Sequence, residues 1–491
     1  MGLAFVPLYL RYLGIEAYGL IGVFVLLQAW LSLLDIGLTP TLSREMARFK
    51  AGAHTPQSVR DLICSMELVF LVIACVVAIG VILAAPWLAI DWLQLEKLSP
   101  DEVTNALAIA GVVVAVRWLA TLYRSAITGL QELVWLNGCT AIFSTFRGLG
   151  VVAILAWISP TIQAFFIYQG VLTALEVMVL SLQMRRLLPI SPQPARFSWK
   201  SLQSVGRFAA GMTAISVLAT FLTQVDKVLL SKLLPLTDFG YFTLASTVAG
   251  GLYFLIMPFS NVLRPRLAEL VACGQTDALA DTYHKFSQML TLIVVPASLV
   301  LSLFSDHVLL LWTRNVTTTV AVAPLVSVLV LGTMINGWMN TPYALQLAYG
   351  KTRFALWTNT ISLIVFIPAI YVSVSTYGAI GAAAMWVLLN LGYVTIALPF
   401  MHRAFLAQEK WRWYAQDVLI PTISAAIPIA LIYGLSQAPG LERPLSSVVT
   451  VTLAFIAAQM SATLMTKFGR DQIHRVWIVM HSHRAGIAAK L

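Results

Sequence analysis

Long apolar stretches separated by short polar or basic segments recur along the whole chain. An α-helix needs about 20 apolar residues to cross a bilayer, and this pattern predicts fourteen such helices among the 491 residues. We therefore predict an all-α integral membrane protein. The approximate limits of the predicted spans are 1–13, 17–38, 62–88, 105–128, 134–158, 162–184, 205–233, 240–263, 286–312, 319–347, 355–374, 379–400, 418–436 and 446–466.

The first predicted span is shorter than the others. It holds about 13 residues before Gly14, and at 1.5 Å per residue it covers about 20 Å of a hydrocarbon layer of roughly 30 Å. The segment has neither the basic start nor the small-residue cleavage site of a signal peptide. We expect the natural chain to begin upstream of Met1, inside a longer first helix; a genuine half-span is the alternative.

The layout of the spans repeats at an offset of 221 residues, which places Tyr18-Gly19 on Phe239-Gly240. Six spans separate the two copies. Because this number is even, both copies have the same orientation, and an axis along the membrane normal relates them. The pattern predicts two parallel six-helix repeats, which would form two lobes, and two additional C-terminal helices.

Five segments follow from this layout. An N-lobe over 1–184 and a C-lobe over 205–400 flank a cytoplasmic linker at 185–204, which is rich in proline and basic residues. Helices 13 and 14 occupy 401–466, and a cytoplasmic tail follows at 467–491.

The composition supports a membrane protein and the charges predict its orientation. Charged residues make up 11% of the chain, whereas soluble domains carry about 25%. If even-numbered spans end in the cytoplasm, 22 lysines and arginines lie in cytoplasmic segments and five in outer segments. This positive-inside bias predicts a multi-pass protein with both termini in the cytoplasm. It also accounts for the net charge of +10 without nucleic acid as a partner.

Motifs for enzyme chemistry are missing from the sequence. The four cysteines suggest no disulfide framework, and the seven histidines show no metal-ligand spacing. The chain contains no P-loop, no G-x-S-x-G and no H-E-x-x-H motif. We predict a transporter rather than an enzyme, with no metal site and no cofactor.

Three arginines lie inside predicted spans, where a charge costs several kcal/mol. Arg117 and Arg124 are seven residues apart, so they project within about 20° of each other on one helix. Arg147 lies in the middle of the next, antiparallel span. We expect them to form a cationic strip that lines a cavity and binds an anion, since guanidinium groups bind phosphate in a bidentate manner. Interhelical ion pairing, or snorkelling of Arg124 to the inner surface, is the structural alternative.

The repeat offers an internal comparison for these arginines. At an offset of 221, Arg117 corresponds to Trp338 and Arg147 to Pro368, so the second half lacks the charges. The bundle architecture alone therefore does not require them, and we predict that the first half holds the anion. Lys227, in the seventh predicted span, is a fourth candidate for the cationic cavity.

Two carboxylates also lie inside predicted spans. Glu176 is in the sixth span and Asp226 in the seventh. An embedded carboxylate is a candidate for coupling to a proton or sodium gradient. The alternative is that each one serves as the partner of an arginine.

Several segments resemble a known transporter family. Leu13-Gly-Ile-Glu-Ala-Tyr-Gly-Leu20, followed by Leu34-Asp-Ile-Gly-Leu38 and Arg44-Glu-Met-Ala47, resembles the start of O-antigen (Wzx-type) and other polysaccharide lipid flippases. Gln224-Val-Asp-Lys-Val-Leu-Leu-Ser-Lys-Leu-Leu234, with Phe239-Gly-Tyr-Phe242, resembles their seventh span. These flippases belong to the multidrug/oligosaccharidyl-lipid/polysaccharide exporter superfamily.

This resemblance implies a function. It implies that the protein moves undecaprenyl-pyrophosphate-linked oligosaccharide from the inner to the outer leaflet of the bacterial inner membrane, by alternating access of two lobes. The product would serve synthesis of O-antigen or another surface polysaccharide. The implied partners are the lipid-linked substrate, membrane lipids, a glycan polymerase and chain-length machinery.

Three alternatives remain at this point. A drug/cation antiporter of the same superfamily would favour an acidic cavity over a basic one. A membrane-bound glycan polymerase or ligase would carry a sizeable outer loop, which the sequence lacks. A scaffold for glycan enzymes would not transport at all.

Overall fold

The computed structural model describes residues 2–35, 37–188, 193–199, 203, 217, 220–436, 447–472 and 474. Contacts divide the chain into two compact units, Met1–Thr243 and Leu244–Leu491. The described residues contain no β-strand, and this confirms the prediction of an all-helical protein. Parts of the predicted linker and the start of the predicted C-lobe fall outside the described residues, and the division into lobes of 1–184 and 205–400 stays a prediction.

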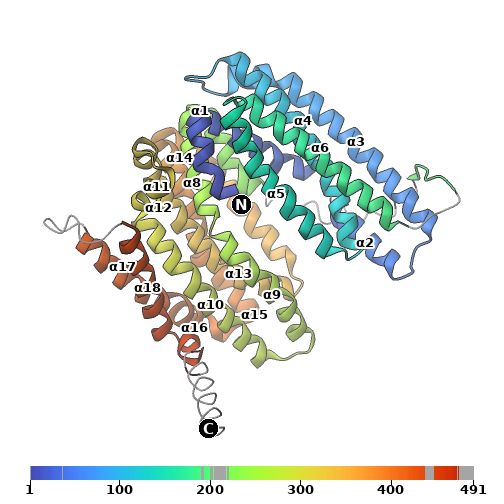
Figure 1. Cartoon of the computed structure of the whole chain (residues 1–491). Helices are drawn as coiled ribbons and strands as arrows, with labels where there is room; N and C mark the ends of the chain where they lie inside the picture. The colour runs from blue at the N-terminus through green and yellow to red at the C-terminus, as the bar shows by residue number, and fades with distance from the viewer. Residues whose placement is uncertain are drawn as a thin grey trace, which may run out of the picture. The chain divides into compact units, whose positions relative to one another are not determined.

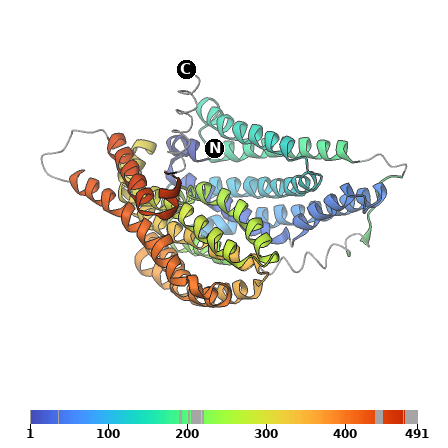
Figure 2. The ribbon, with the colours of Figure 1, turned by 90° about the horizontal axis from the view of Figure 1, so that it is seen from below.

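The first unit is built mainly from six long or medium helices. Their bounds are α1 (Gly2–Leu31), α2 (Leu38–Lys50), α3 (Pro56–Trp87), α4 (Pro100–Gly129), α5 (Leu133–Trp157) and α6 (Ile162–Leu187). A further helical segment at 220–233 precedes α8 (Leu236–Gly250). Helices α3, α4, α6 and α5 run side by side (Figures 1 and 2), and α4 packs against both α3 and α6. This packing places α4 in the core of the unit.

The second unit contains the remaining helices. They are α9 (Tyr253–Ala272), α10 (Thr276–Leu303), α11 (Ser305–Thr313), α12 (Val316–Trp338), α13 (Asn340–Ala348), α14 (Thr352–Gly392), α15 (Leu398–Phe405), α16 (Lys410–Arg412), α17 (Ile420–Ser436) and α18 (Ser447–Met465). Helices α17 and α18 form an antiparallel pair (Figure 1), and both contact α10.

Ten described helical segments are long and apolar enough to cross a membrane. The pair α8 and α9, bent by 44°, would make an eleventh. The protein is therefore a multi-pass membrane protein, but the predicted count of fourteen is not confirmed. Two of the ten segments each contain two predicted spans, and about half of the seventh predicted span, 205–233, lies outside the described residues.

The first of these two merged segments bends sharply at Gly14. This residue has φ 80° and ψ 173°, a conformation that glycine adopts without steric cost. Tyr9 packs on Phe165 at 5.5 Å between ring centroids, and Phe24 packs on the adjacent Phe166 at 5.1 Å. A straight helix would separate residues 9 and 24 by about 22 Å. The structure thus separates the segments that the sequence predicts as the first two spans.

The second merged segment, α14, folds back on itself at Gly378, where φ is 59°. A Cβ atom on Gly381 would lie 2.2 Å from the carbonyl oxygen of Ser373, although eight residues of straight helix cover about 12 Å. Residues 354–366 and 385–400 also line one common pocket. Helix α14 is therefore a helical hairpin, whose two arms correspond to the predicted spans 355–374 and 379–400.

The two copies of the aromatic-glycine motif make a reciprocal contact. A Cβ atom on Gly19 would lie 2.6 Å from the carbonyl oxygen of Leu236, and one on Gly240 would lie 2.4 Å from that of Ile15. Both pairs of positions are related by the offset of 221 residues. A reciprocal contact is what a two-fold axis produces, and glycine permits it because the backbones approach closely. The contact supports the predicted repeat.

Candidate functional site

The three predicted arginines lie on two neighbouring helices of the first unit. Arg117 and Arg124 are on α4, Arg147 is on α5, and the acidic Glu176 is on α6. We call these four residues, together with Gln169 of α6, the arginine cluster. It brings together residues from three helices. A charged or polar side chain placed alone in the bilayer would cost free energy.

Glu176 lies at the centre of the cluster and joins two of the arginines. Its side chain is buried, with only 2% of its surface exposed. Its Oε2 accepts a hydrogen bond of 2.6 Å from Nη2 of Arg147, while its Oε1 pairs with Nη2 of Arg124. One carboxylate thus compensates two guanidinium groups, which leaves one positive charge in excess. These contacts are the ones expected from the alternative prediction, in which Glu176 is the partner of an arginine.

Arg117 lies two helical turns from Arg124 and has a different set of contacts. Its Nη2 donates to Oε1 of Gln169 at 3.0 Å, and its guanidinium carbon lies 5.2 Å from the ring centroid of Phe24. Gln169 is seven residues before Glu176, as Arg117 is seven residues before Arg124. The two arginines of α4 therefore face two acceptors of α6, the neutral Gln169 and the acidic Glu176. Neither an amide nor an aromatic ring carries a compensating charge, so these contacts leave Arg117 without an acidic partner.

The cluster retains hydrogen-bonding capacity. The Nε atoms of Arg117 and Arg147 are buried and have no hydrogen-bond partner among the described residues. The side chains of Arg124 and Arg147 are about a third and a quarter exposed. A guanidinium carries five N–H donors, so donors remain free on all three side chains. With three arginines and one carboxylate, the cluster has the charge and the donors to bind an anion.

The structure does not bring Lys227 and Asp226 into the arginine cluster through any contact among the described residues. The Nζ of Lys227 donates to the carbonyl oxygen of Thr223 and to Oε1 of Gln224, both at 3.3 Å and both on its own helix. Oδ1 of Asp226 is buried and has no hydrogen-bond partner among the described residues. Their predicted roles in substrate binding and ion coupling stay predictions.

Sequence reasoning missed two polar residues that contact the arginines. Gln169 accepts from Arg117, and Thr140 on α5 accepts from Nη1 of Arg124 at 3.2 Å. A signal for Gln169 was present, because its spacing from Glu176 equals that between the two arginines of α4. Thr140 had no such signal.

A second buried polar network, in the second unit, was also missed. His284 on α10 lies 2.5 Å from Oδ2 of Asp417 through Nδ1 and 2.8 Å from Oε2 of Glu409 through Nε2. Gln288 donates to Asp417 at 2.8 Å and accepts from the backbone N–H of Phe468 at 3.1 Å. The network ties α10 to the segments that precede α17 and follow α18. Within the described part of the chain, no group of His, Cys, Asp and Glu side chains could hold a metal ion.

Comparisons with known proteins agree with this architecture. The family described as "Polysaccharide biosynthesis protein" matches residues 10–321. The "Putative O-antigen transporter" of Shigella flexneri is 20% identical over 377 residues, which cover 77% of this chain and 87% of that protein. The prediction of a transporter rather than an enzyme is confirmed.

Two solved structures share the fold. "Lipid II flippase MurJ, inward closed conformation" aligns with a TM-score of 0.71 and 14% identity, over 96% of this chain and 97% of that one. An inward-facing multidrug resistance MATE family transporter of the MOP superfamily aligns with a TM-score of 0.69 and 13% identity, over 82% of this chain and 93% of that one. At such identities the likeness shows the fold alone. Because the family match spans more than half of the chain, this protein belongs to the polysaccharide biosynthesis protein family.

Proposed function

We propose that the protein flips undecaprenyl-pyrophosphate-linked oligosaccharide from the inner to the outer leaflet of the bacterial inner membrane. The observation that carries the proposal is the arginine cluster, which keeps excess positive charge and free N–H donors among apolar helices. A pyrophosphate group matches such donors, since it accepts bidentate hydrogen bonds from guanidinium groups. The family match and the flippase-like fold support the same substrate class.

In this proposal the headgroup binds to the arginines while the lipid tail stays in the bilayer. Arg117 and Arg147 hold the anion, and Arg124 is divided between the anion and Glu176. Alternating access of two lobes then moves the headgroup, with a proton or sodium gradient as the energy source. Both termini lie in the cytoplasm, and a glycan polymerase and chain-length machinery use the product.

A flipping assay in proteoliposomes tests the proposal. Fluorescent undecaprenyl-pyrophosphate glycan is incorporated, a gradient is supplied, and its exposure in each leaflet is scored. Wild-type protein should transport, while Arg117→Ala and Arg147→Ala should lose transport and still fold, because Glu176 keeps Arg124 as its partner when Arg147 is removed. Arg266→Ala is a matched control, because Arg266 forms an exposed ion pair with Glu269 at 2.8 Å on α9.

Two outcomes would overturn parts of the proposal. Equal transport by wild type and both cluster variants would leave the arginines a structural role. No transport by folded wild-type protein would remove the flippase assignment and favour the drug/cation antiporter, whose fold the MATE comparison also matches. Efflux of a cationic dye from the same vesicles would then identify the antiporter.

A further inference from the structure

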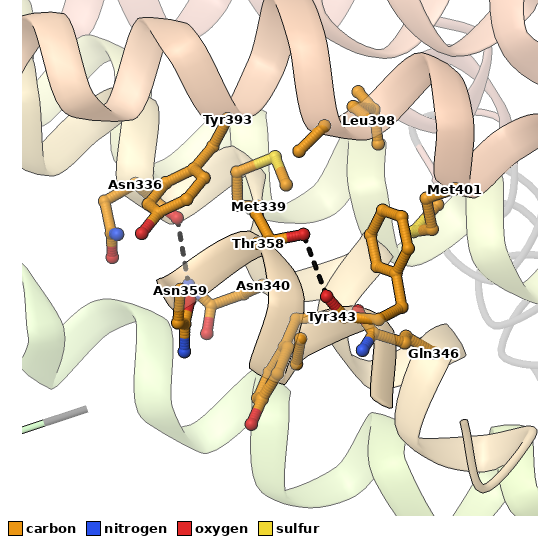
Figure 3. Close-up of a pocket in the computed structure, with 13 residues that line it drawn as sticks. Asn336, Met339, Asn340, Tyr343, Gln346, Thr358, Asn359, Tyr393, Leu398 and Met401 are labelled. Carbon is orange, nitrogen blue, oxygen red and sulfur yellow. Dashed lines mark hydrogen bonds between the residues drawn. The ribbon is translucent and has the colours of Figure 1, made fainter. Parts of the chain in front are cut away.

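A pocket in the second unit contains an unusual number of neutral polar side chains. It has a volume of about 200 Å³ and is lined by residues of α12, α13, the first arm of α14, the helical segment Tyr393–Ala397 that follows α14, and α15. Figure 3 shows Asn336, Asn340 and Asn359 on one side of this pocket, and Gln346 on the other. None of its lining residues is charged. We call it the amide pocket.

Two of the amides are fixed in orientation by other side chains. Nδ2 of Asn336 donates to Asn390 at 2.8 Å, and its Oδ1 accepts from the hydroxyl of Tyr253 at 2.9 Å. Oδ1 of Asn340 accepts from the hydroxyl of Ser260 at 3.0 Å. These bonds hold the wall of the amide pocket rigid before any ligand binds, which reduces the cost of binding.

Other polar groups of the pocket are free. The amide of Asn359 and the hydroxyl of Tyr343 make no side-chain hydrogen bond with any described residue. Each group can both donate and accept. Free amides and hydroxyls beside the aromatic rings of Tyr343 and Tyr393 suit a hydroxyl-rich ligand such as a sugar, since hydroxyls exchange hydrogen bonds with both kinds of group.

The amide pocket continues into an apolar groove of about 440 Å³ between the two arms of α14. Phe354, Thr358, Tyr393 and Ala397 line both spaces. Along the groove, Trp357, Val365 and Ile396 are more than 60% exposed. Because these side chains belong to membrane-spanning segments, the groove is open to lipid chains.

The position of the two spaces along the helices matches the orientation of a lipid. The amide pocket lies at the end of α14 next to Lys351, whose carbonyl oxygen accepts from Nε2 of Gln346 at 3.2 Å. Basic residues mark this end as the cytoplasmic side of the predicted topology. The groove runs from there along the arms towards the middle of the span. A headgroup would thus sit at the interface and its chain in the hydrocarbon layer.

We propose that the amide pocket and the apolar groove together bind a glycolipid through its uncharged sugar and the first part of its chain. A phospholipid fits less well, because no lining side chain could pair with its phosphate. The site goes beyond the proposed function: because the transported lipid carries a pyrophosphate between its sugar and its chain, the same lack of a partner for phosphate excludes it, and the occupant is an uncharged glycolipid whose sugar is joined to its chains without a phosphate. Binding itself can be tested without transport.

The test uses full-length protein in phosphatidylcholine nanodiscs and two photoactivatable probes. One is a monogalactosyl diacylglycerol with a diazirine in its chain; the other has the same chains and a phosphocholine headgroup. Crosslinked peptides are mapped by mass spectrometry. The galactosyl probe should label 354–366 and 385–400 in preference to other exposed spans, and unlabelled galactolipid should compete. The phosphocholine probe should label all exposed spans alike.

Variants connect the labelling to the amide pocket. Asn359→Leu and, with a smaller change of shape, Tyr343→Phe should each lower galactosyl labelling of these two segments about fivefold, as expected for the loss of a hydrogen bond. Ile423→Ala, at an exposed position of α17, should leave it unchanged. Equal labelling by both probes, or full labelling of Asn359→Leu and Tyr343→Phe, would overturn the site.

The result is separable from that of the transport assay. Because Arg147 lies in the first unit, the Arg147→Ala variant should retain wild-type galactosyl labelling. Preferential labelling in protein that fails to flip lipid would refute the proposed function and keep the site. Transport without preferential labelling would refute the site and keep the proposed function.

Discussion

Nη2 of Arg147 and Oε2 of Glu176 are joined at 2.6 Å across the interface of α5 and α6. The same carboxylate pairs with Arg124, so its charge is shared by two guanidinium groups. A buried ion pair contributes little net stability as a unit, but removal of one partner is costly because the other charge remains buried. This asymmetry makes the pair a sensitive point for mutation.

We expect Glu176→Gln to lower the free energy of unfolding by about 3–5 kcal/mol, since two arginines lose their compensating charge. Denaturant or thermal unfolding of the purified protein in detergent measures the change. The double variant Glu176→Gln with Arg147→Gln should recover part of the loss. Glu269→Gln removes the exposed partner of Arg266 and should cost about 0–1 kcal/mol. Equal effects at Glu176 and Glu269 would contradict the buried pairing.

Asp226 and Glu176 should differ in their effect on gradient coupling. Both oxygens of Glu176 pair with arginines, whereas Oδ1 of Asp226 is buried and has no partner in the part of the chain that the structure describes. We therefore expect Asp226→Asn to abolish any stimulation of transport by a proton or sodium gradient. Transport in proteoliposomes with and without each gradient is the measurement. An Asp226→Asn protein that still responds to the gradient would eliminate Asp226 as the coupling group.

The reciprocal glycine contact predicts matched effects at two distant positions. Gly19→Ala and Gly240→Ala each place a Cβ atom within 3 Å of a carbonyl oxygen. Each should destabilise the protein by about 1–3 kcal/mol, as overpacking does. Gly80→Ala is the control, because nothing lies within 4 Å of its Cβ position. Melting temperatures of the three variants compare them; two unaffected motif variants would contradict the close approach.

His284 should stabilise the second unit. Asp417 is fully buried and relies on His284 and Gln288 for its hydrogen bonds. We expect His284→Asn to lower the free energy of unfolding by about 1–3 kcal/mol, because the buried carboxyl group of Asp417 loses a hydrogen-bond partner. His307→Asn removes a histidine that pairs with the exposed carboxylate of Asp306, and should change little. Unfolding in detergent compares the two variants, and similar stabilities would argue against a structural role for the network.

The features that were predictable from the sequence depend on local spacing. The seven-residue interval between Arg117 and Arg124 places both side chains on one face of α4, and the structure shows them facing the same helix. The glycines at 14 and 378 separate apolar stretches, and the chain bends at both. Such features follow from helical periodicity and glycine conformation, which a sequence displays directly.

The features that were not predictable depend on contacts between distant segments. Glu176 could be recognised as a partner for an arginine, but its pairing with both Arg124 and Arg147 requires the register of three helices. His284 and Asp417 are 133 residues apart, and neither lies in a motif. The amide pocket likewise depends on the fold-back of α14, which brings Asn359 near Tyr393. The chemical type of each side chain can be read from the sequence, whereas contacts between side chains that lie far apart in the chain cannot.

One carboxylate compensates only one of its two arginine partners, and the remaining positive charge has an electrical consequence. Arg124, Arg147 and Glu176 carry one net positive charge between them, and they are embedded in helices that cross the membrane. A resting voltage acts on such a charge with about 2.3 kcal/mol per 100 mV for a complete crossing. A displacement through a quarter of the field therefore involves about 0.6 kcal/mol of work per 100 mV. Movement of α4, α5 and α6 along the membrane normal would register as a gating current.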